Sequence, residues 1–262
     1  MSEQQESIPP QSTAPSGFDK RPRALGVDRG WEWIPAGWKL FMAAPGIWIA
    51  TTIIFFCIYF VVSWFPIIGR FAGNLIAPIL SAGLMFACEE IRAGRPFQVS
   101  HMFEGFRRET GPLLITGLVY AVACLFVSFV MMLMIGAAIG TTALAGILTN
   151  NDPWQIAAII GSASIGLLLA LLVSLTLSIP IAMAIWFAPA LVFLDKLSPK
   201  DALAASFDAS LRNMLPFLLY GVVMTVLFIA GSIPLGIGLL VVIPLLVTST
   251  YAAYREIFHG DK

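Results

Sequence analysis

The twenty residues from Gly46 to Phe65, GIWIATTIIFFCIYFVVSWF, contain no charged side chain. A segment of about 20 apolar residues is long enough to cross the hydrocarbon core of a bilayer as one helix. Four more charge-free windows follow along the chain, at Phe71–Cys88, Thr110–Asn151, Pro153–Leu194 and Asn213–Tyr254. The sequence therefore predicts an all-α protein, a polytopic bundle of transmembrane helices.

The composition excludes several classes of protein. Of the 262 residues, 58% are hydrophobic and 11% are charged, against about 25% charged in an ordinary soluble domain. Fifteen cationic and fifteen anionic side chains give a net charge of zero, so we expect no nucleic-acid partner. Cys57, Cys88 and Cys124 lie in or beside apolar segments, which indicates packing thiols and no disulfide framework.

We expect six spans, arranged as three hairpins. They lie at about residues 46–65, 71–88, 112–138, 154–187, 215–231 and 235–254. The middle region could instead hold four short spans. We favour two long ones because the sequence Asn151-Asp152-Pro153 resembles a helix cap followed by proline at the first helical position. Two such helices overrun a hydrocarbon core of about 30 Å, so we expect them to tilt or to project from it.

Orientation follows from the basic residues. With six spans, fourteen of the fifteen Lys and Arg residues fall on one side and only Arg70 falls on the other. The positive-inside rule then places both termini in the cytoplasm of a bacterial cell, with cytoplasmic loops at 89–111 and 195–214. Residues 1–30 are polar and proline-rich and lack the apolar core of a signal peptide, so we expect a disordered cytoplasmic tail before a membrane domain at 31–262.

Each predicted hairpin follows a segment with amphipathic helical spacing, the first at 31–43, and each second helix contains a proline, at Pro78, Pro180 and Pro244. We interpret this as a threefold parallel repeat of interfacial helix, span, turn and kinked span.

In the second segment Met102, Phe103 and Phe106 should oppose Glu104 and Arg108. In the third, Leu203, Phe207, Leu211 and Met214 form the apolar face, and Asp208 should pair with Arg212. The predicted membrane-interface anchors are Trp31, Trp38, Lys39, Arg107, Arg108 and Arg212. The alternative is that these segments dock a cytoplasmic protein.

Three motifs carry a resemblance to a known family: GWKLF at 37–41 with Pro45, APILSAGLM at 77–85, and FEGFRRETGPLL at 103–114. Together they resemble an uncharacterised family of bacterial six-span inner-membrane proteins. The resemblance implies an inner-membrane location. It supplies no catalytic residue.

Candidate chemistry is sparse. Ionisable groups buried in a bilayer usually indicate function, yet the predicted spans contain no Asp, Glu, Lys or His. His101 and His259 lie far apart without other ligands at metal-binding spacing. Glu89 and Glu90 could form a catalytic carboxylate pair, but a solvated helix end is the simpler interpretation. We therefore expect no catalytic residue, no metal site and no cofactor.

One polar feature lies on the second span. Arg70, Asn74 and Ser81 fall within about 40° of one another around the helix at 100° per residue. They could form a polar track for an anionic or hydrogen-bonding solute. In the alternative interpretation Arg70 reaches outer headgroups, Asn74 and Ser81 bond neighbouring helices, and the Gly69–Gly73 spacing permits close packing.

These observations favour a non-catalytic membrane scaffold or partner-binding protein. A small transporter or channel that uses the polar track is the alternative, and a membrane enzyme is the third hypothesis. The expected partners are the lipid bilayer and either a second copy of the chain or a cytoplasmic protein. The glycine pairs at Gly69–Gly73 and Gly136–Gly140 are compatible with self-association.

Overall fold

The computed structural model describes residues 21–65, 68–148 and 153–261, and within these ranges every regular element is helical. The elements are α1 (Arg29–Met42), α2 (Pro45–Ser63), α3 (Ile68–Arg92), η1 (Val99–Phe103), α4 (Glu104–Arg107), α5 (Thr110–Leu148), α6 (Pro153–Ile185), α7 (Ala188–Phe193), α8 (Pro199–Arg212), α9 (Met214–Ser232) and α10 (Leu239–His259). The predicted all-α architecture is confirmed.

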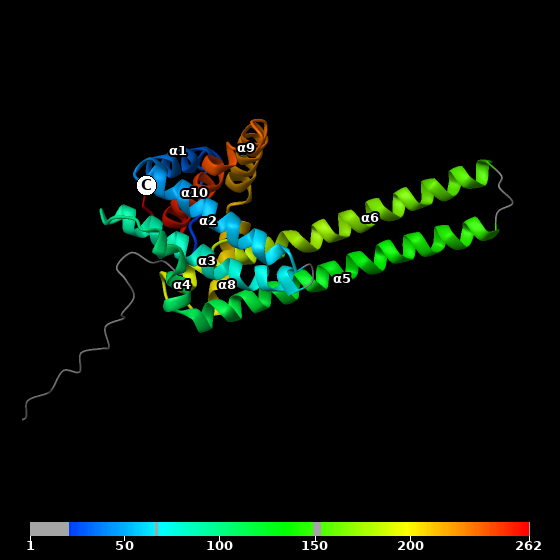
Figure 1. The fold of residues 1–262 in the computed structure, drawn as a ribbon, viewed down its shortest axis with the longest axis horizontal. Coiled ribbons are helices and arrows are strands. Elements are labelled where there is room, and N and C mark those ends of the chain that lie inside the picture. Colours follow the sequence, from blue (N-terminus) through cyan, green and yellow to red (C-terminus); the bar gives the residue numbers. More distant parts are fainter. Residues whose placement is uncertain (1–20, 66–67, 149–152, 262) are drawn as a thin grey trace, which may run out of the picture.

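Six of the described helices are long and apolar enough to cross a membrane: α2, α3, α5, α6, α9 and α10. They form the three predicted hairpins (Figure 1). The middle region consists of two long helices, α5 with 39 residues and α6 with 33. The helix α5 continues to Leu148, well past the predicted end at residue 138, because no proline or charged residue interrupts it before there. Pro78, Pro180 and Pro244 lie inside α3, α6 and α10.

Glycines allow the hairpin α2–α3 and the helix pair α3–α5 to approach closely. A Cβ atom on Gly69 would collide with the carbonyl of Val62, and Gly73 lies against the ring of Tyr59. The predicted close packing at the Gly69–Gly73 spacing is thus present between α2 and α3. On the other side of α3, a Cβ atom on Gly117 of α5 would collide with the carbonyl of Leu75.

The hairpin α5–α6 extends far beyond α3. Gly117 packs beside Leu75, which is only seven residues from the start of α3 at Ile68, whereas α5 runs on for another 31 residues to Leu148. At about 1.5 Å per residue, α5 projects about 36 Å further than α3 in that direction. Figure 1 shows α5 and α6 leaving the remaining helices as a long pair. The hairpin therefore projects beyond the other helices, and its overrun of a hydrocarbon core stays a prediction.

The three hairpins do not stand parallel. In Figure 1 α9 rises at a steep angle to α5 and α6, and the hairpins spread from a shared end that we call the base. The base contains the C-terminal parts of α3 and α10, the start of α5, and the short helices α7 and α8. All six residues of α7 are buried there, as is most of the last turn of α10, including Ile257 and Phe258.

The segment before α1 is held against the base. The Arg23 amide donates to the carbonyl of Ile257 at 3.1 Å. The buried Asn213 accepts from the amide of Leu25 and donates to the carbonyl of Arg23, both at 2.9 Å. The expectation of a disordered tail therefore does not hold for residues 22–28. The side chain of Asn213 provides hydrogen-bond partners for the backbone of this segment, which has no regular secondary structure. Residues 1–20 of that expected tail lie outside the described residues.

The helices α1 and α8 pack on the bundle partly through small residues and expose several large ones, and α1 also buries Trp33 and Phe41. A Cβ atom on Gly37 of α1 would collide with the backbone of Ser249, and α8 buries Ala202, Ser206, Ala209 and Ser210. Their outward surfaces carry Trp31, Trp38 and Met42 on α1, and Phe207 and Leu211 on α8.

The second amphipathic segment differs from the prediction. Met102 is buried and Arg108 is exposed, but Glu104 is buried and Phe106 is exposed, so these last two residues do not follow the expected faces. The reason is a pair of ionic contacts, because Glu104 binds Arg107 at 3.2 Å and Arg108 at 2.9 Å.

Candidate functional site at the charged base

The predicted polar track of Arg70, Asn74 and Ser81 stays a prediction. Asn74 and Ser81 are half-buried on α3, and the side chain of Arg70 lies outside the described residues. A cavity of about 20 Å³ does separate α2 from α3, but Tyr59, Gly73 and Ala77 are among the residues that line it, and neither Asn74 nor Ser81 is. Its volume accommodates about one water molecule.

The six predicted interface anchors are all exposed: Trp31, Trp38, Lys39, Arg107, Arg108 and Arg212. The ring of Trp38 lies 5.2 Å from that of Phe41. The predicted pair of Asp208 and Arg212 is present at 2.8 Å. Anchoring at a membrane interface stays a prediction for all six.

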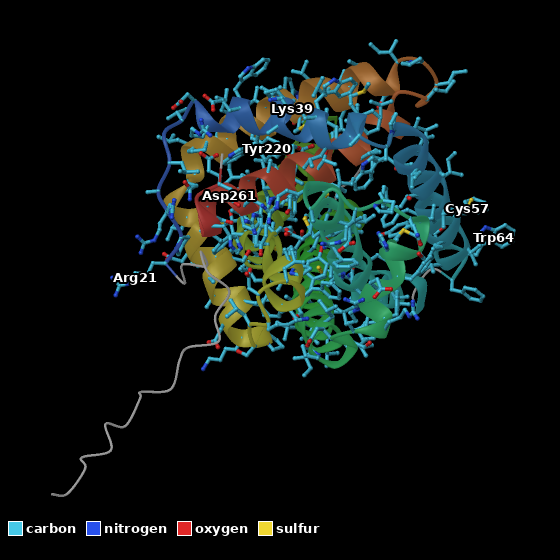
Figure 2. The ribbon with its side chains drawn as sticks, turned by 90° about the vertical axis from the view of Figure 1, so that its left-hand side faces the viewer. Arg21, Lys39, Cys57, Trp64, Tyr220 and Asp261 are labelled. Carbon is cyan, nitrogen blue, oxygen red and sulfur yellow. The ribbon has the colours of Figure 1, made fainter. Side chains whose placement is uncertain are left out.

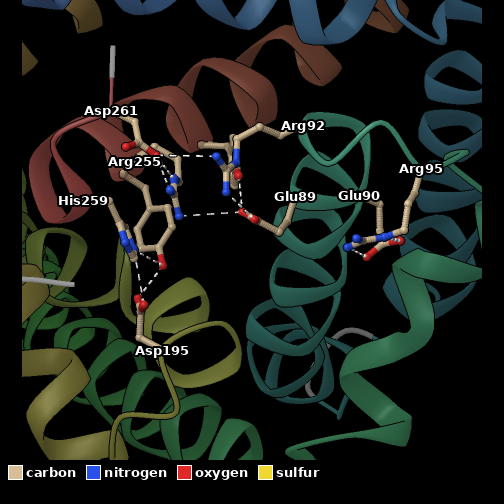
Figure 3. Close-up of polar contacts among 10 residues, drawn as sticks. Glu89, Glu90, Arg92, Arg95, Asp195, Arg255, His259 and Asp261 are labelled. Atoms are coloured by element: carbon tan, nitrogen blue, oxygen red, sulfur yellow. Dashed lines mark hydrogen bonds and ion pairs between the residues drawn. The ribbon is translucent and has the colours of Figure 1, made fainter. Parts of the chain in front are cut away.

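Many charged residues of the described chain meet at the base, where Glu89 joins α3 to α10. Glu89 Oε1 accepts from Arg92 at 2.7 Å, and its other oxygen accepts from the hydroxyl of Tyr251 and lies 3.9 Å from Arg255 Nη1. Arg255 also binds Asp261, with its Nε 3.0 Å from the carboxylate. This network ties the end of α3 to the end of α10 (Figure 3).

Glu90 belongs to a separate contact. Both of its oxygens accept from Arg95 at 2.6 Å, and this hydrogen bonding raises the pKa of Arg95 above its ordinary value. Glu89 and Glu90 thus bind different arginines in different directions (Figure 3). The two neighbouring carboxylates do not face each other as a pair.

A second cluster lies beside the first, and the rings of Tyr251 and Tyr254 are 6.1 Å apart. The hydroxyl of Tyr254 donates to Asp195, and His259 Nε2 lies 3.2 Å from Asp195 and 3.1 Å from the Tyr254 hydroxyl. The Asp195 side chain is only 3% exposed and that of His259 only 7%. The contacts attach the loop between α7 and α8 to the end of α10.

A third cluster joins α1 to α10. Glu256 is buried and accepts from Arg29 Nε at 2.6 Å and from the indole of Trp33 at 2.8 Å. Arg29 also binds the exposed Glu32. Trp33 is 1% exposed and packs against Phe217 and Tyr220 of α9. A cavity of about 390 Å³ lies beside these residues, between α1 and α10.

The three clusters fix the ends of helices. Their carboxylates accept hydrogen bonds from arginine, tyrosine or tryptophan, and such charge-assisted contacts are stronger than neutral ones. The hydrogen bond from Arg255 lowers the pKa of Asp261 below its ordinary value, so Asp261 stays ionised at neutral pH. Within the ranges that the structure describes, no group of three or more His, Cys, Asp or Glu side chains is placed to hold a metal ion.

Sequence reasoning missed most of this site. It assigned the neighbourhood of Tyr251 and Tyr254 to an apolar span and treated Glu89 as a solvated helix end. A usable signal was present: the stretch TYAAYREIFH at 250–259 places two tyrosines, an arginine, a glutamate and a histidine at the end of a span. Partners on α1, α3 and the α7–α8 loop could not be inferred, because these contacts join residues up to 227 positions apart.

Comparison with known proteins agrees with the membrane architecture. Residues 64–185 match the model of a family described as "Predicted integral membrane protein (DUF2189)". A probable inner membrane protein of Burkholderia thailandensis is 28% identical over 240 residues, which cover 87% of this chain and 82% of that relative. No solved structure matches the chain. The resemblance to an uncharacterised family of bacterial inner-membrane proteins is confirmed, and the chain is an integral membrane protein.

Proposed function

We propose that this integral membrane protein is a non-catalytic scaffold that self-associates through the hairpin α5–α6. The projection of that hairpin is the observation that carries the proposal. Only 11% of the apolar window of α5 and 11% of that of α6 is buried, against 61% for α10. The hairpin therefore presents most of its surface to its surroundings.

The apolar surface of α5 is longer than the hydrocarbon core of a bilayer is thick. The 39 residues of α5 measure about 58 Å at about 1.5 Å per residue, nearly twice a hydrocarbon core of about 30 Å. Exposed apolar side chains occupy its outer half, among them Phe129, Met132, Ile139 and Leu144. A helix that exceeds the thickness of the bilayer tilts, kinks or thickens the bilayer locally, and such mismatch also drives some association between helices, which would cover the apolar surface.

The surface of α5 includes a place where another helix could approach closely. Gly136 and Gly140 are one turn apart and exposed, and a Cβ atom on either would meet no atom within 4 Å. Gly69 and Gly73, in contrast, are already used between α2 and α3. Small residues at this spacing drive close packing of membrane helices. A twofold axis would bring the same face of α5 from two copies together, so a second copy of the chain is the partner we assign.

Molar mass in lipid nanodiscs tests this assignment. The unmodified chain should exceed its monomer mass of 28.3 kDa, and the double variant Gly136→Leu, Gly140→Leu should return to the monomer. The matched control is Gly221→Leu, because Gly221 on α9 is also exposed with no atom near its Cβ position. A monomeric unmodified chain, or a double variant that stays oligomeric, contradicts the proposal.

The proposal of no catalysis rests on the pairing of the carboxylates. Glu89, Asp195 and Glu256 lie at the base, and each accepts from a tyrosine, tryptophan or arginine that anchors another helix. A general acid or base needs a free face toward a substrate. These three carboxylates are instead occupied in holding the helices together.

We further propose that both termini are cytoplasmic in the bacterial inner membrane. The described basic residues of α3, α4, α8 and α10 gather at the base, which the positive-inside rule assigns to the cytoplasm. Fusions at residue 262 test this: green fluorescent protein should fluoresce there and alkaline phosphatase should be inactive. The opposite pair of results would reverse the orientation.

A small transporter is the second candidate, supported by a different cavity from the one expected. A space of about 390 Å³ between α5 and α6 is lined by Tyr120, Cys124, Ser128 and Ser178. Single cysteines at positions 74, 81 and 128 of a chain without its native cysteines test for a water-filled path. Labelling of position 128 by a membrane-impermeant thiol reagent would favour a transporter, whereas protection at all three favours the scaffold.

A further inference from the structure

The cavity between α1 and α10 has a lining unlike that of the other cavities described. Its volume is about 390 Å³, and four cationic side chains line it: Arg29, Lys39, Arg92 and Arg255. Glu32, Glu256 and Asp261 also line it, so four cations and three anions give the lining a net charge of +1. Lys39 and Asp261 are both labelled in Figure 2, which faces the base.

The four cations differ in how firmly they are held. Arg29 is bound by the buried Glu256 at 2.6 Å and by Glu32, so it belongs to the framework of the fold. Lys39 has an exposed side chain, and it forms no ion pair with the residues described at 21–65, 68–148 and 153–261. It is therefore available to a ligand.

Arg92 and Arg255 converge on one exposed carboxylate. Arg255 Nε lies 3.0 Å from Asp261 Oδ2, and Arg92 Nη1 lies 3.6 Å from the same oxygen. The side chain of Asp261 is 45% exposed. Its position depends on Gly260, which ends α10 with a φ of 74° and so turns the chain back toward the cavity.

A carboxylate in this position occupies a site that suits a phosphate group. Guanidinium groups bind carboxylates and phosphates with the same planar donor geometry. Without Asp261, the lining carries four cations and two anions, which is a net charge of +2. Lys39 would then add a third cation beside Arg92 and Arg255.

We propose that this cavity binds a phosphate group and that Asp261 competes with it for Arg92 and Arg255. The phosphate could belong to an anionic phospholipid or be free in solution. The exposed Trp38 and Met42 next to Lys39 favour the lipid, because aromatic and apolar side chains beside a basic residue are typical of a headgroup interface. This inference does not depend on self-association through α5 and α6.

Titration calorimetry on the full chain in nonionic detergent tests the inference. The two probes are a short-chain phosphatidylglycerol and inorganic phosphate, with a short-chain phosphatidylcholine as the lipid without net charge. Asp261→Asn removes the competing carboxylate without disturbing a buried group. We expect it to bind phosphatidylglycerol about fivefold more tightly than the unmodified chain, which is the scale of one partly exposed ion pair.

Matched variants keep the result specific. Asp208→Asn removes an exposed carboxylate that pairs with Arg212 on α8, away from the cavity, and should leave the affinity unchanged. Arg92→Gln should weaken binding, whereas Arg95→Gln, which alters the separate contact with Glu90, should not. The same order of variants with inorganic phosphate alone would support the site and assign it to free phosphate. No binding of either probe, or equal affinity for Asp261→Asn and the unmodified chain, would overturn the proposal.

Discussion

Glu256→Ala is the substitution from which we expect the largest loss of stability at the base. Glu256 accepts from Arg29 Nε at 2.6 Å and from the Trp33 indole at 2.8 Å, and its side chain is only 8% exposed. The alanine variant leaves an indole donor unsatisfied at a site where Trp33 is 1% exposed. It also leaves Arg29, whose side chain is 18% exposed, without its buried partner.

The magnitude follows from these two losses. An unsatisfied buried donor costs about 1–3 kcal/mol, and breaking a buried ion pair costs about 3–5 kcal/mol. Because the two penalties share one carboxylate and Arg29 keeps Glu32, we expect a total of about 3–5 kcal/mol. At about 2–4 °C for each kcal/mol in a chain of this size, the midpoint of thermal unfolding should fall by about 10 °C.

Thermal unfolding in detergent, followed by intrinsic tryptophan fluorescence, measures this shift. Glu32→Ala is the matched control, because Glu32 binds the same arginine from an exposed position, with its side chain 50% exposed. An exposed ion pair contributes about 0–1 kcal/mol, so the control should shift the midpoint by no more than about 3 °C. Equal shifts for the two variants would refute the argument that burial makes Glu256 the structural partner.

Three further predictions concern other contacts at the base. Gly37→Leu should detach α1, because a side chain there collides with the backbone of Ser249; the variant should lower yield and unfolding midpoint, whereas Gly111→Leu, placed in open space, should not. Asn213→Ala removes the partners of Leu25 and Arg23, so limited trypsin digestion should cut at Arg21 and Arg23 several times faster, while Ser198→Ala should leave that rate unchanged. The effect of Asp261 on phosphatidylglycerol binding should follow its pKa, which lies below the ordinary value of 3.8. Because Asp261 is ionised at every pH above 3.8, the affinity ratio of Asp261→Asn to the unmodified chain should stay constant from pH 8 to pH 5. It should approach one only as the pH falls below that value, and a ratio that changes near pH 6 would contradict the assignment.

Much of the fold is determined by local sequence, and for that reason it could be predicted. Long charge-free windows indicate membrane helices, and the two long helices expected in the middle region are present as α5 and α6. The helix cap predicted at Asn151 and Asp152 lies outside the described residues. The glycine spacing at Gly69 and Gly73 indicated close packing that occurs between α2 and α3. Each of these inferences needed only neighbouring residues.

The candidate site could not be derived in the same way, because it depends on contacts between distant segments. Glu89 was interpreted as a solvated helix end, and its partner Tyr251 lies 162 positions away. Asn213 holds the segment before α1 across 188 positions. Helical periodicity places Arg70, Asn74 and Ser81 on one face of the helix. It contains no information on whether the neighbouring helices leave a cavity beside that face.

Cysteine cross-linking in intact membranes tests the self-association of α5 most directly. In a chain whose native Cys57, Cys88 and Cys124 are replaced, Gly140→Cys should form a disulfide-linked dimer upon mild oxidation, because Gly140 is exposed and open on α5. Gly221→Cys, equally exposed on α9, should remain monomeric. A monomer for Gly140→Cys, or equal cross-linking at both positions, would contradict the account of α5 and α6 as the hairpin through which two copies meet.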